Sequence, residues 1–222
     1  HLIQAPQTSV YGCLNDNSQF SKLLDLCRPA NLSNLLTSIG MKTDEQKQFT
    51  VFSDVFANNT TENKKYDCLD QNVNFYNTYN YTLYAPDNDA MDLAFKKGLP
   101  TWEQVQEVMD NASANDENAK AKALKMAEAI RNFIRYHFQD FALYADNTID
   151  YGDAQEVENG NRSYMTSCTI GSAYKRLKVK GGSGKLYVTD EGGDPVIINA
   201  NGDKLVNFMA RDYIFKSGAI ET

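Results

Sequence analysis

The sequence has few of the residues that build common catalytic and metal centres. Histidine occurs only at His1 and His137, so one chain cannot supply a metal site with several imidazole ligands. A Ser-His-Asp arrangement would have to use His137, and the G-x-S-x-G pattern of hydrolase nucleophiles is absent. We therefore expect no catalytic residues, no metal site, no cofactor and no enzymatic activity.

Long apolar runs and an excess of positive charge are also lacking. No apolar stretch approaches the roughly 18 residues that span a bilayer as a helix. With 22 basic and 29 acidic residues the net charge is −7, which disfavours nucleic acid and anionic membrane surfaces as partners. The sequence opens with His1 and shows no signal peptide, so we interpret it as a processed or trimmed chain. Any targeting signal or lipid anchor could then have been upstream of His1.

The four cysteines, Cys13, Cys27, Cys68 and Cys168, include no C-x-x-C pair. This spacing argues against a zinc knuckle or a thioredoxin-like site. Two disulfides in any of three connectivities are compatible with the count, and the sequence selects none of them. Because Cys13 and Cys27 stand beside apolar residues at helical spacing, we predict that both are buried thiols.

The order of patterns is helices first, then helices mixed with strands, then mainly strands, which indicates an α+β fold. Helices are predicted from apolar residues at helical spacing, with caps such as Ser9, Ser18 and Thr101 and stops such as Gly40 and Gly98. Strands are predicted from alternating or aromatic-rich runs. The predicted helices are two within 9–27, then 31–39, 89–95, 101–109 and about 119–138. The predicted strands are 49–56, 72–85, 141–146, 163–170, 174–180, 185–190, 195–203 and 205–215.

His137 shares an apolar helical face with Met126, Ile130 and Phe133. That position predicts a buried, hydrogen-bonded imidazole at a junction between helix and sheet. The alternative is a hydrolase or other enzyme in which His137 works with carboxylates such as Asp140.

Three further patterns have structural interpretations. The GGSGK at 181–185 lacks P-loop spacing and lies between two predicted strands, so it predicts a hairpin turn. Basic residues at 175–180 alternate with apolar ones, as on the solvated face of a strand. N-x-S/T sequons would be glycosylation sites in a secreted eukaryotic protein and coincidental in a bacterial one. The sequons begin at Asn31, Asn58, Asn59, Asn80, Asn111 and Asn161.

The segment YTLYAPDNDAM, 81–91, changes from strand to helix over a few residues. Pro86 cannot donate to a ladder and stops the strand. Asp87 or Asn88 can then accept hydrogen bonds from the free N–H groups of the next turn, and Asp89 favours the positive end of the helix dipole. The spacing does not match a calcium loop, since Ala90 and an apolar residue follow at once. We interpret the segment as a strand-to-helix joint.

This joint resembles the first signature of fasciclin-like domains, in which Ala85, Pro86, Asn88 and Ala90 match the motif after an extended run that includes Tyr81. Tyr136 and His137 match the family's Tyr-His pair. The segment 201–215 is similar to the second signature, with Val206–Asn207 where the family usually has Ile-His. SVYGCLNDNSQFSKLLDLC resembles the helical opening of the domain, and GLPTWEQV a helix often found after the first signature. These matches follow the family's order over roughly residues 9–216.

The resemblance implies a wedge-shaped β-sandwich with packed α-helices, formed as a single domain over 1–222. Residues at about 41–80 look like an inserted β-hairpin or loop. Elaborated domains of this kind are similar to surface proteins of Bacteroidetes. The implied location is therefore extracellular or at the cell surface, which in a bacterium means outer-membrane-anchored, as in a lipoprotein, or periplasmic.

The function that the resemblance implies is non-catalytic adhesion or interaction with a protein or matrix ligand. An alternative is surface glycan binding through an aromatic run, because exposed aromatic rings can stack on sugars. The rings considered are Phe75, Tyr76, Tyr79, Tyr81 and Tyr84. The competing interpretation is that these rings pack on the core of the protein.

Overall fold

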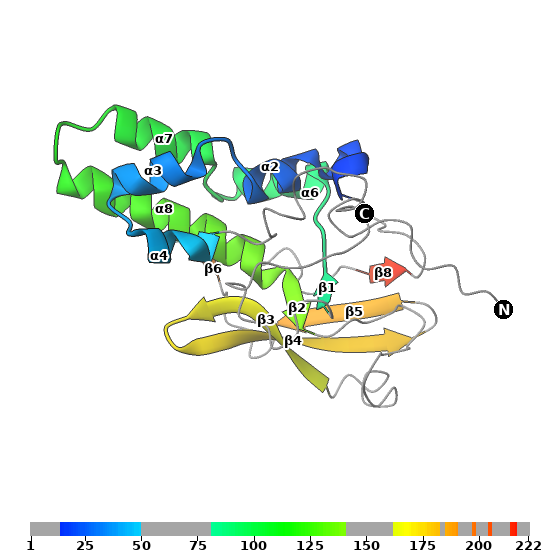
Figure 1. Cartoon of the computed structure of the whole chain (residues 1–222). Coiled ribbons are helices and arrows are strands. Elements are labelled where there is room, and N and C mark those ends of the chain that lie inside the picture. The colour runs from blue at the N-terminus through cyan, green and yellow to red at the C-terminus, as the bar shows by residue number, and fades with distance from the viewer. Residues whose placement is uncertain are drawn as a thin grey trace, which may run out of the picture.

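The computed structural model describes residues 14–49, 81–140 and 162–182, and the backbone of four later strands at 185–190, 197–198, 204–205 and 214–216. In these segments a layer of helices lies on one side of an antiparallel sheet (Figure 1). The protein is therefore α+β, as the order of sequence patterns predicts.

Helices make up most of the first two described segments. The first segment contains η1 (Ser18–Phe20), α2 (Ser21–Cys27), α3 (Leu32–Ile39), α4 (Thr43–Gln46) and η2 (Lys47–Phe49). The second runs from β1 (Tyr81–Leu83) through α6 (Asn88–Lys96), α7 (Trp102–Asp110) and α8 (Glu117–Tyr136) to β2 (Phe138–Asp140). The helices predicted for 31–39, 89–95, 101–109 and 119–138 correspond to α3, α6, α7 and α8.

Most of the predicted helix boundaries are confirmed by the caps that the structure shows. Thr101 and Gln104 form a reciprocal capping box at the start of α7. Gly40 follows α3 with φ of 102°, a left-handed conformation that glycine adopts without strain. The prediction that Ser18 caps a helix is wrong, because Ser18 lies inside η1. The side chain of Asn17 instead accepts the bond from the Gln19 N–H.

Phe49 corrects the predicted strand at 49–56, because it is the last residue of the 3-10 helix η2. Its ring is buried, meets Trp102 edge-on at 6.3 Å between centroids, and carries the Arg131 guanidinium over its face at 5.3 Å. Packing on α7 and α8 thus overrides the strand propensity of the local sequence. The segment taken as an insertion also opens with helical residues at 43–49. The rest of the inserted hairpin or loop predicted at about 41–80, namely residues 50–80, lies outside the described residues.

The described strands form a six-stranded antiparallel sheet in the order β1-β2-β3-β4-β5-β8, and a separate two-stranded ladder of β6 and β7. The later strands are β3 (Arg162–Ile170), β4 (Ala173–Gly182), β5 (Lys185–Asp190), β6 (Ile197–Ile198), β7 (Lys204–Leu205) and β8 (Ile214–Lys216). Gly182 pairs with Lys185, so β4 and β5 form the predicted hairpin across 183–184. Of the strand predicted over 205–215, Leu205 belongs to the β6–β7 ladder and 214–215 belong to the β5–β8 ladder, and 206–213 lie outside the described residues. The predicted strand at 141–146 lies outside the described residues.

The long helix α8 connects the helical layer to the sheet. Its buried face contains the predicted stripe, including Met126, Ile130 and Phe133. The helix was predicted to continue to Phe138, but it ends at Tyr136. Phe138 instead begins β2, which pairs with β1 on one side and β3 on the other. The chain therefore passes from helix to sheet at His137.

Two cysteine positions are described, and both agree with packing in the core. Cys27 in α2 and Cys168 in β3 are buried free thiols. Burial raises the pKa of each thiol to about 12, so both stay protonated and unreactive near neutral pH. Cys13 and Cys68 lie outside the described residues.

Candidate functional site

Two of the motifs that resemble the family, the first signature at 81–91 and the Tyr136–His137 pair, meet in space where β1 lies beside the end of α8. Leu83 pairs with Phe138 in the β1–β2 ladder, and the Tyr84 N–H donates to the His137 carbonyl at 3.0 Å. We call the residues around this contact, Tyr84, Tyr136, His137 and Gln139, the motif junction. All four side chains are buried. The sequence separates these motifs widely, and the fold brings them into direct contact.

His137 has the structural surroundings that its position on the helix predicts. Its Nδ1 donates to the Phe133 carbonyl oxygen at 2.6 Å, and its ring lies 4.5 Å from the Phe133 ring. The side chain has no exposed surface, and burial lowers the pKa of the imidazole to about 4. The ring is therefore neutral near pH 7, with Nε2 buried and without a hydrogen-bond partner. Asp140, the carboxylate considered beside it, is also buried.

The first motif works as a joint between helices and sheet. Asp87 accepts from the Ala90 N–H at 2.8 Å, which makes it the N-cap of α6. Asn88 has a different role that the sequence does not reveal. Its Oδ1 accepts from the Lys22 N–H at 3.0 Å and its Nδ2 donates to the Ser18 carbonyl at 3.0 Å. One side chain thereby joins the start of α6 to η1 and α2.

The remaining motif positions are structural or lie outside the described residues. Pro86 is buried, Ala85 is half-buried against the core, and Ala90 is half-buried. Asn207, in the second signature, lies outside the described residues. The motif junction thus explains how the fold is held together, and it offers no exposed side chain for a partner.

The aromatic run does not provide a sugar platform in the part that the structure describes. Tyr81 is buried with its ring 5.9 Å from that of Phe138, and Tyr84 is buried with its hydroxyl donating to Gln139 Oε1 at 2.9 Å. The proposal that these two rings contact a glycan is therefore corrected: both pack inside the protein. Phe75, Tyr76 and Tyr79 lie outside the described residues.

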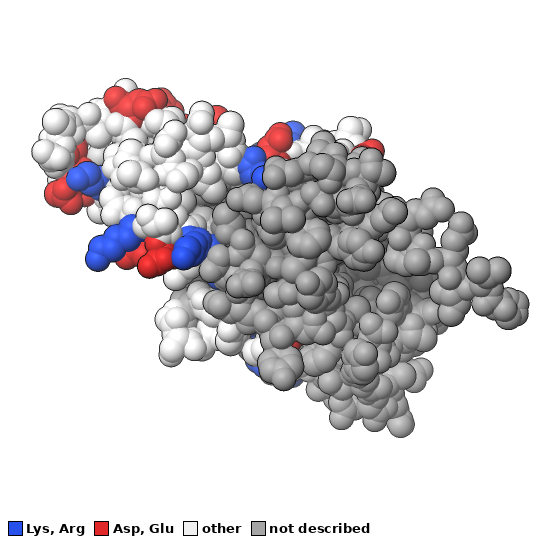
Figure 2. All heavy atoms as spheres, viewed as in Figure 1, with Lys and Arg blue, Asp and Glu red and all other residues white. Residues whose placement is uncertain are grey.

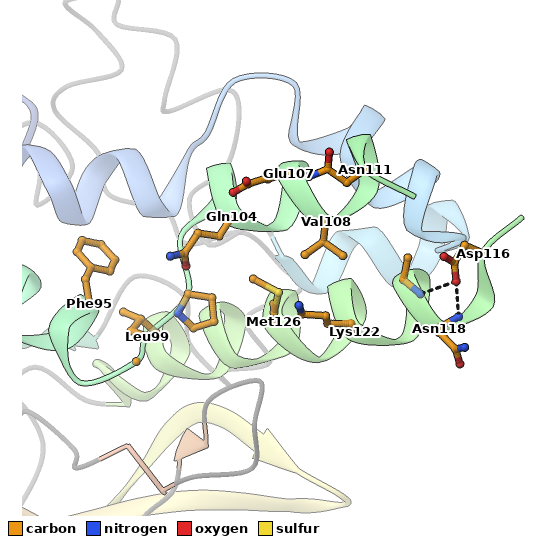
Figure 3. A pocket seen from close by; sticks show the side chains of 13 residues that line it. Phe95, Leu99, Gln104, Glu107, Val108, Asn111, Asp116, Asn118, Lys122 and Met126 are labelled. Atoms are coloured by element: carbon orange, nitrogen blue, oxygen red, sulfur yellow. Dashed lines mark hydrogen bonds between the residues drawn. The ribbon is translucent and has the colours of Figure 1, made fainter. Parts of the chain in front are cut away.

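Two open grooves lie on either side of α7, and they form the candidate interaction surface. The first, which we call the inner groove, has a volume of about 750 Å³ and is lined by residues of α7, α8 and the segment that precedes α7 (Figure 3). Apolar side chains of Phe95, Leu99, Val108 and Met126 line it, and polar side chains such as Gln104, Lys122 and Asp116 surround them. Asp116 is occupied as the N-cap of α8, where it accepts from the N–H groups of Asn118 and Ala119.

The second groove has a volume of about 740 Å³ and is lined by α7 on one side and by the segment from α2 to α3 on the other. We call it the acidic groove, because four carboxylates line it. Asp25 comes from α2, and the other three come from α7. Arg28 is the single cationic residue among the groove's lining residues. The carboxylates of α7 are Glu103, Glu107 and Asp110.

Sequence reasoning missed the acidic groove, although a signal for it exists. Glu103, Glu107 and Asp110 recur at i, i+4 and i+7, so they share one face of α7. Figure 2 shows acidic side chains gathered along the outer edge of the helical layer, where Figure 1 places α7. The apolar side of the groove comes from a different segment, at residues 29–35, and only the tertiary structure reveals it.

The described part of the chain shows few other kinds of site. No group of three or more His, Cys, Asp or Glu side chains there is arranged to hold a metal ion. Among the same residues, no helix is long and apolar enough to cross a membrane. Comparison with protein-family models, curated proteins and solved structures gave no significant match. The resemblance to fasciclin-like domains therefore rests on the motifs and their order.

Proposed function

We propose that this protein is a non-catalytic interaction module of the fasciclin type that acts at the cell surface or outside the cell. The observation that carries the proposal is the contact between the two motif segments at Tyr84 and His137. The motifs follow the family's order in the sequence, and in the fold they form one joint between β1, α6 and α8. The scaffold we propose is a wedge-shaped β-sandwich with packed helices, formed as a single domain.

The surface around α7 supports a binding role. It has two open grooves with exposed polar residues above apolar side chains, a combination suited to contact with another macromolecule. Glu107 and Asn111 line both grooves, so one partner that crosses α7 would contact both. The partner we propose is therefore a protein or matrix component, bound on the helical layer.

The location of the full-length gene product tests this proposal. A tagged copy should be labelled on intact cells by a membrane-impermeant reagent, or should be recovered from the medium. A cytosolic marker protein with the same tag provides the control for cell lysis. A gene product found only in the cytosol would contradict the proposed function, whatever the isolated chain binds.

A further inference from the structure

The acidic groove carries a more specific inference, which names a partner for the interaction role proposed above. We propose that the groove binds an extended, cationic segment of a partner protein, with alternate Lys or Arg side chains facing α7 and apolar side chains facing residues 29–35. The proposal depends on the groove's two unlike walls, on the unpaired state of its carboxylates and on their spacing.

The two walls of the groove differ in chemistry. One wall is α7, with Glu103, Glu107 and Asp110. The opposite wall, from the end of α2 to the middle of α3, contributes Pro29, Ala30, Leu32 and Leu35. A cation without apolar groups would use only the first wall, and an apolar peptide would leave the carboxylates without partners. A segment in which cationic and apolar side chains alternate would place the cations against the carboxylates and the apolar side chains against the opposite wall.

The carboxylates of α7 are available to such a partner. Among the described residues, no ion pair involves any of the groove's four carboxylates, whereas Asp92, Asp44, Glu117 and Glu128 each pair with a basic side chain. Asp110 receives a hydrogen bond from Gln106 at 2.7 Å, which leaves its charge uncompensated. It stands at the C-terminal end of α7, where the helix dipole disfavours an anion, and no basic residue occupies the last turn. A cationic partner would relieve this unfavourable arrangement.

The spacing of the charges matches an extended chain. Glu103 and Glu107 are separated by about 6 Å along the helix axis, given a rise of about 1.5 Å per residue. Alternate side chains of an extended strand are separated by about 6.6 Å and face the same side. Two cationic side chains at i and i+2 therefore come opposite these two carboxylates, and the residue between them faces the apolar wall.

Trp102 provides the measurement. It is the only tryptophan in the chain, it lines the groove, and its Nε1–H donates to the Leu26 carbonyl at 2.8 Å, which fixes the indole. Titrating the whole chain with a synthetic peptide of alternating Arg and Leu should give a saturable change in Trp102 fluorescence. A peptide with the same composition, but with its Arg and Leu in separate blocks, should bind more weakly.

The decisive variant replaces the carboxylates on α7 by Glu103→Gln, Glu107→Gln and Asp110→Asn. We expect the Kd of the alternating peptide to rise at least about tenfold, since each exposed charge pair contributes a modest amount. A matched control, Asp44→Asn, Asp89→Asn and Glu128→Gln, removes the same charge outside the groove and should change the Kd less than about twofold. Circular dichroism of both variants verifies that each is folded.

A second variant guards against misfolding of the first. Ala30→Arg places a cation in the groove from the opposite wall, where Ala30 is exposed, and should abolish the fluorescence change. Equal Kd values for the groove variant and the control would overturn the proposal. So would equally tight binding of spermine, because a polyamine has no apolar side chains for the second wall. These measurements use purified protein, so they can fail while the cell-surface location holds, and the reverse is also true.

Discussion

The motif junction and the acidic groove differ in the burial and the charge of their polar side chains. At the junction every side chain is buried, and His137 is kept neutral, with the pKa of its imidazole lowered to about 4 by burial. At the groove, carboxylates remain exposed and without cationic partners, and three of them are crowded on one helix face. The junction is therefore part of the buried core, while the groove keeps exposed negative charge. Motifs that carry a family resemblance can thus lie in the core, while the proposed binding surface lies elsewhere.

The largest expected effect comes from the aromatic packing beneath the junction. Phe133→Ala removes a fully packed ring that contacts His137, and such changes cost about 3–5 kcal/mol of unfolding free energy. Urea denaturation followed by circular dichroism measures this loss. A loss below about 1 kcal/mol would show that the junction is not a tightly packed part of the core.

The next effect is a dependence of stability on pH. The pKa of His137 is about 6.5 when unfolded and about 4 when folded, so the unfolded chain binds a proton more tightly. Above pH 6.5 the imidazole is neutral in both states, and its contribution to the unfolding free energy is largest. As the pH falls from 6.5 towards 4, the unfolded chain takes up a proton that the folded chain does not, so this contribution is lost. The loss amounts to about 3 kcal/mol over that range. His137→Gln should be less stable at pH 7, and its stability should fall less between pH 7 and pH 5 than that of the unchanged protein. Parallel pH curves for the two proteins would refute this prediction.

A smaller effect is expected at the joint that holds α6 to α2. Asn88→Ala removes hydrogen bonds to the Lys22 N–H and the Ser18 carbonyl, and should lower the unfolding free energy by about 1–3 kcal/mol. The neighbouring Asp87→Ala removes only the cap of α6, at a cost of about 1 kcal/mol. Thermal and urea unfolding of the two variants should show a larger loss of unfolding free energy for Asn88→Ala, which breaks contacts between helices, than for Asp87→Ala, which removes a helix cap. Equal losses would mean that the bridge adds nothing to stability.

The smallest effect on stability should come from the groove itself. Glu107→Gln relieves repulsion with Glu103 at i, i+4 and should leave stability unchanged or raise it by a few tenths of a kcal/mol. Precise urea titrations in low salt, with Glu117→Gln as a control that breaks an ion pair with Lys120, measure this difference. A clear loss of stability in the Glu107 variant would show that the groove, like the junction, serves the fold.

Local sequence patterns are sufficient to predict those helices whose ends depend on residues close by in the chain. The capping box of α7, the glycine stop of α3 and the buried stripe of α8 follow from short spacings that the sequence displays directly. Phe49 and Phe138 were misassigned because their conformations depend on distant partners, namely Trp102 and Arg131 for the first and β1 for the second. Of the candidate binding surface, the acidic stripe of α7 was visible in the sequence, but the wall opposite it was not.

The sequence by itself determined the α+β class, most helix boundaries and the burial of His137, because periodicity and capping act over a few residues. The tertiary structure alone decided that Asn88 bridges two helices, that Tyr81 and Tyr84 face inwards, and that the carboxylates of α7 stand opposite an apolar wall. These features join segments far apart in the chain. They depend on packing between elements, which the spacing within any one segment does not encode.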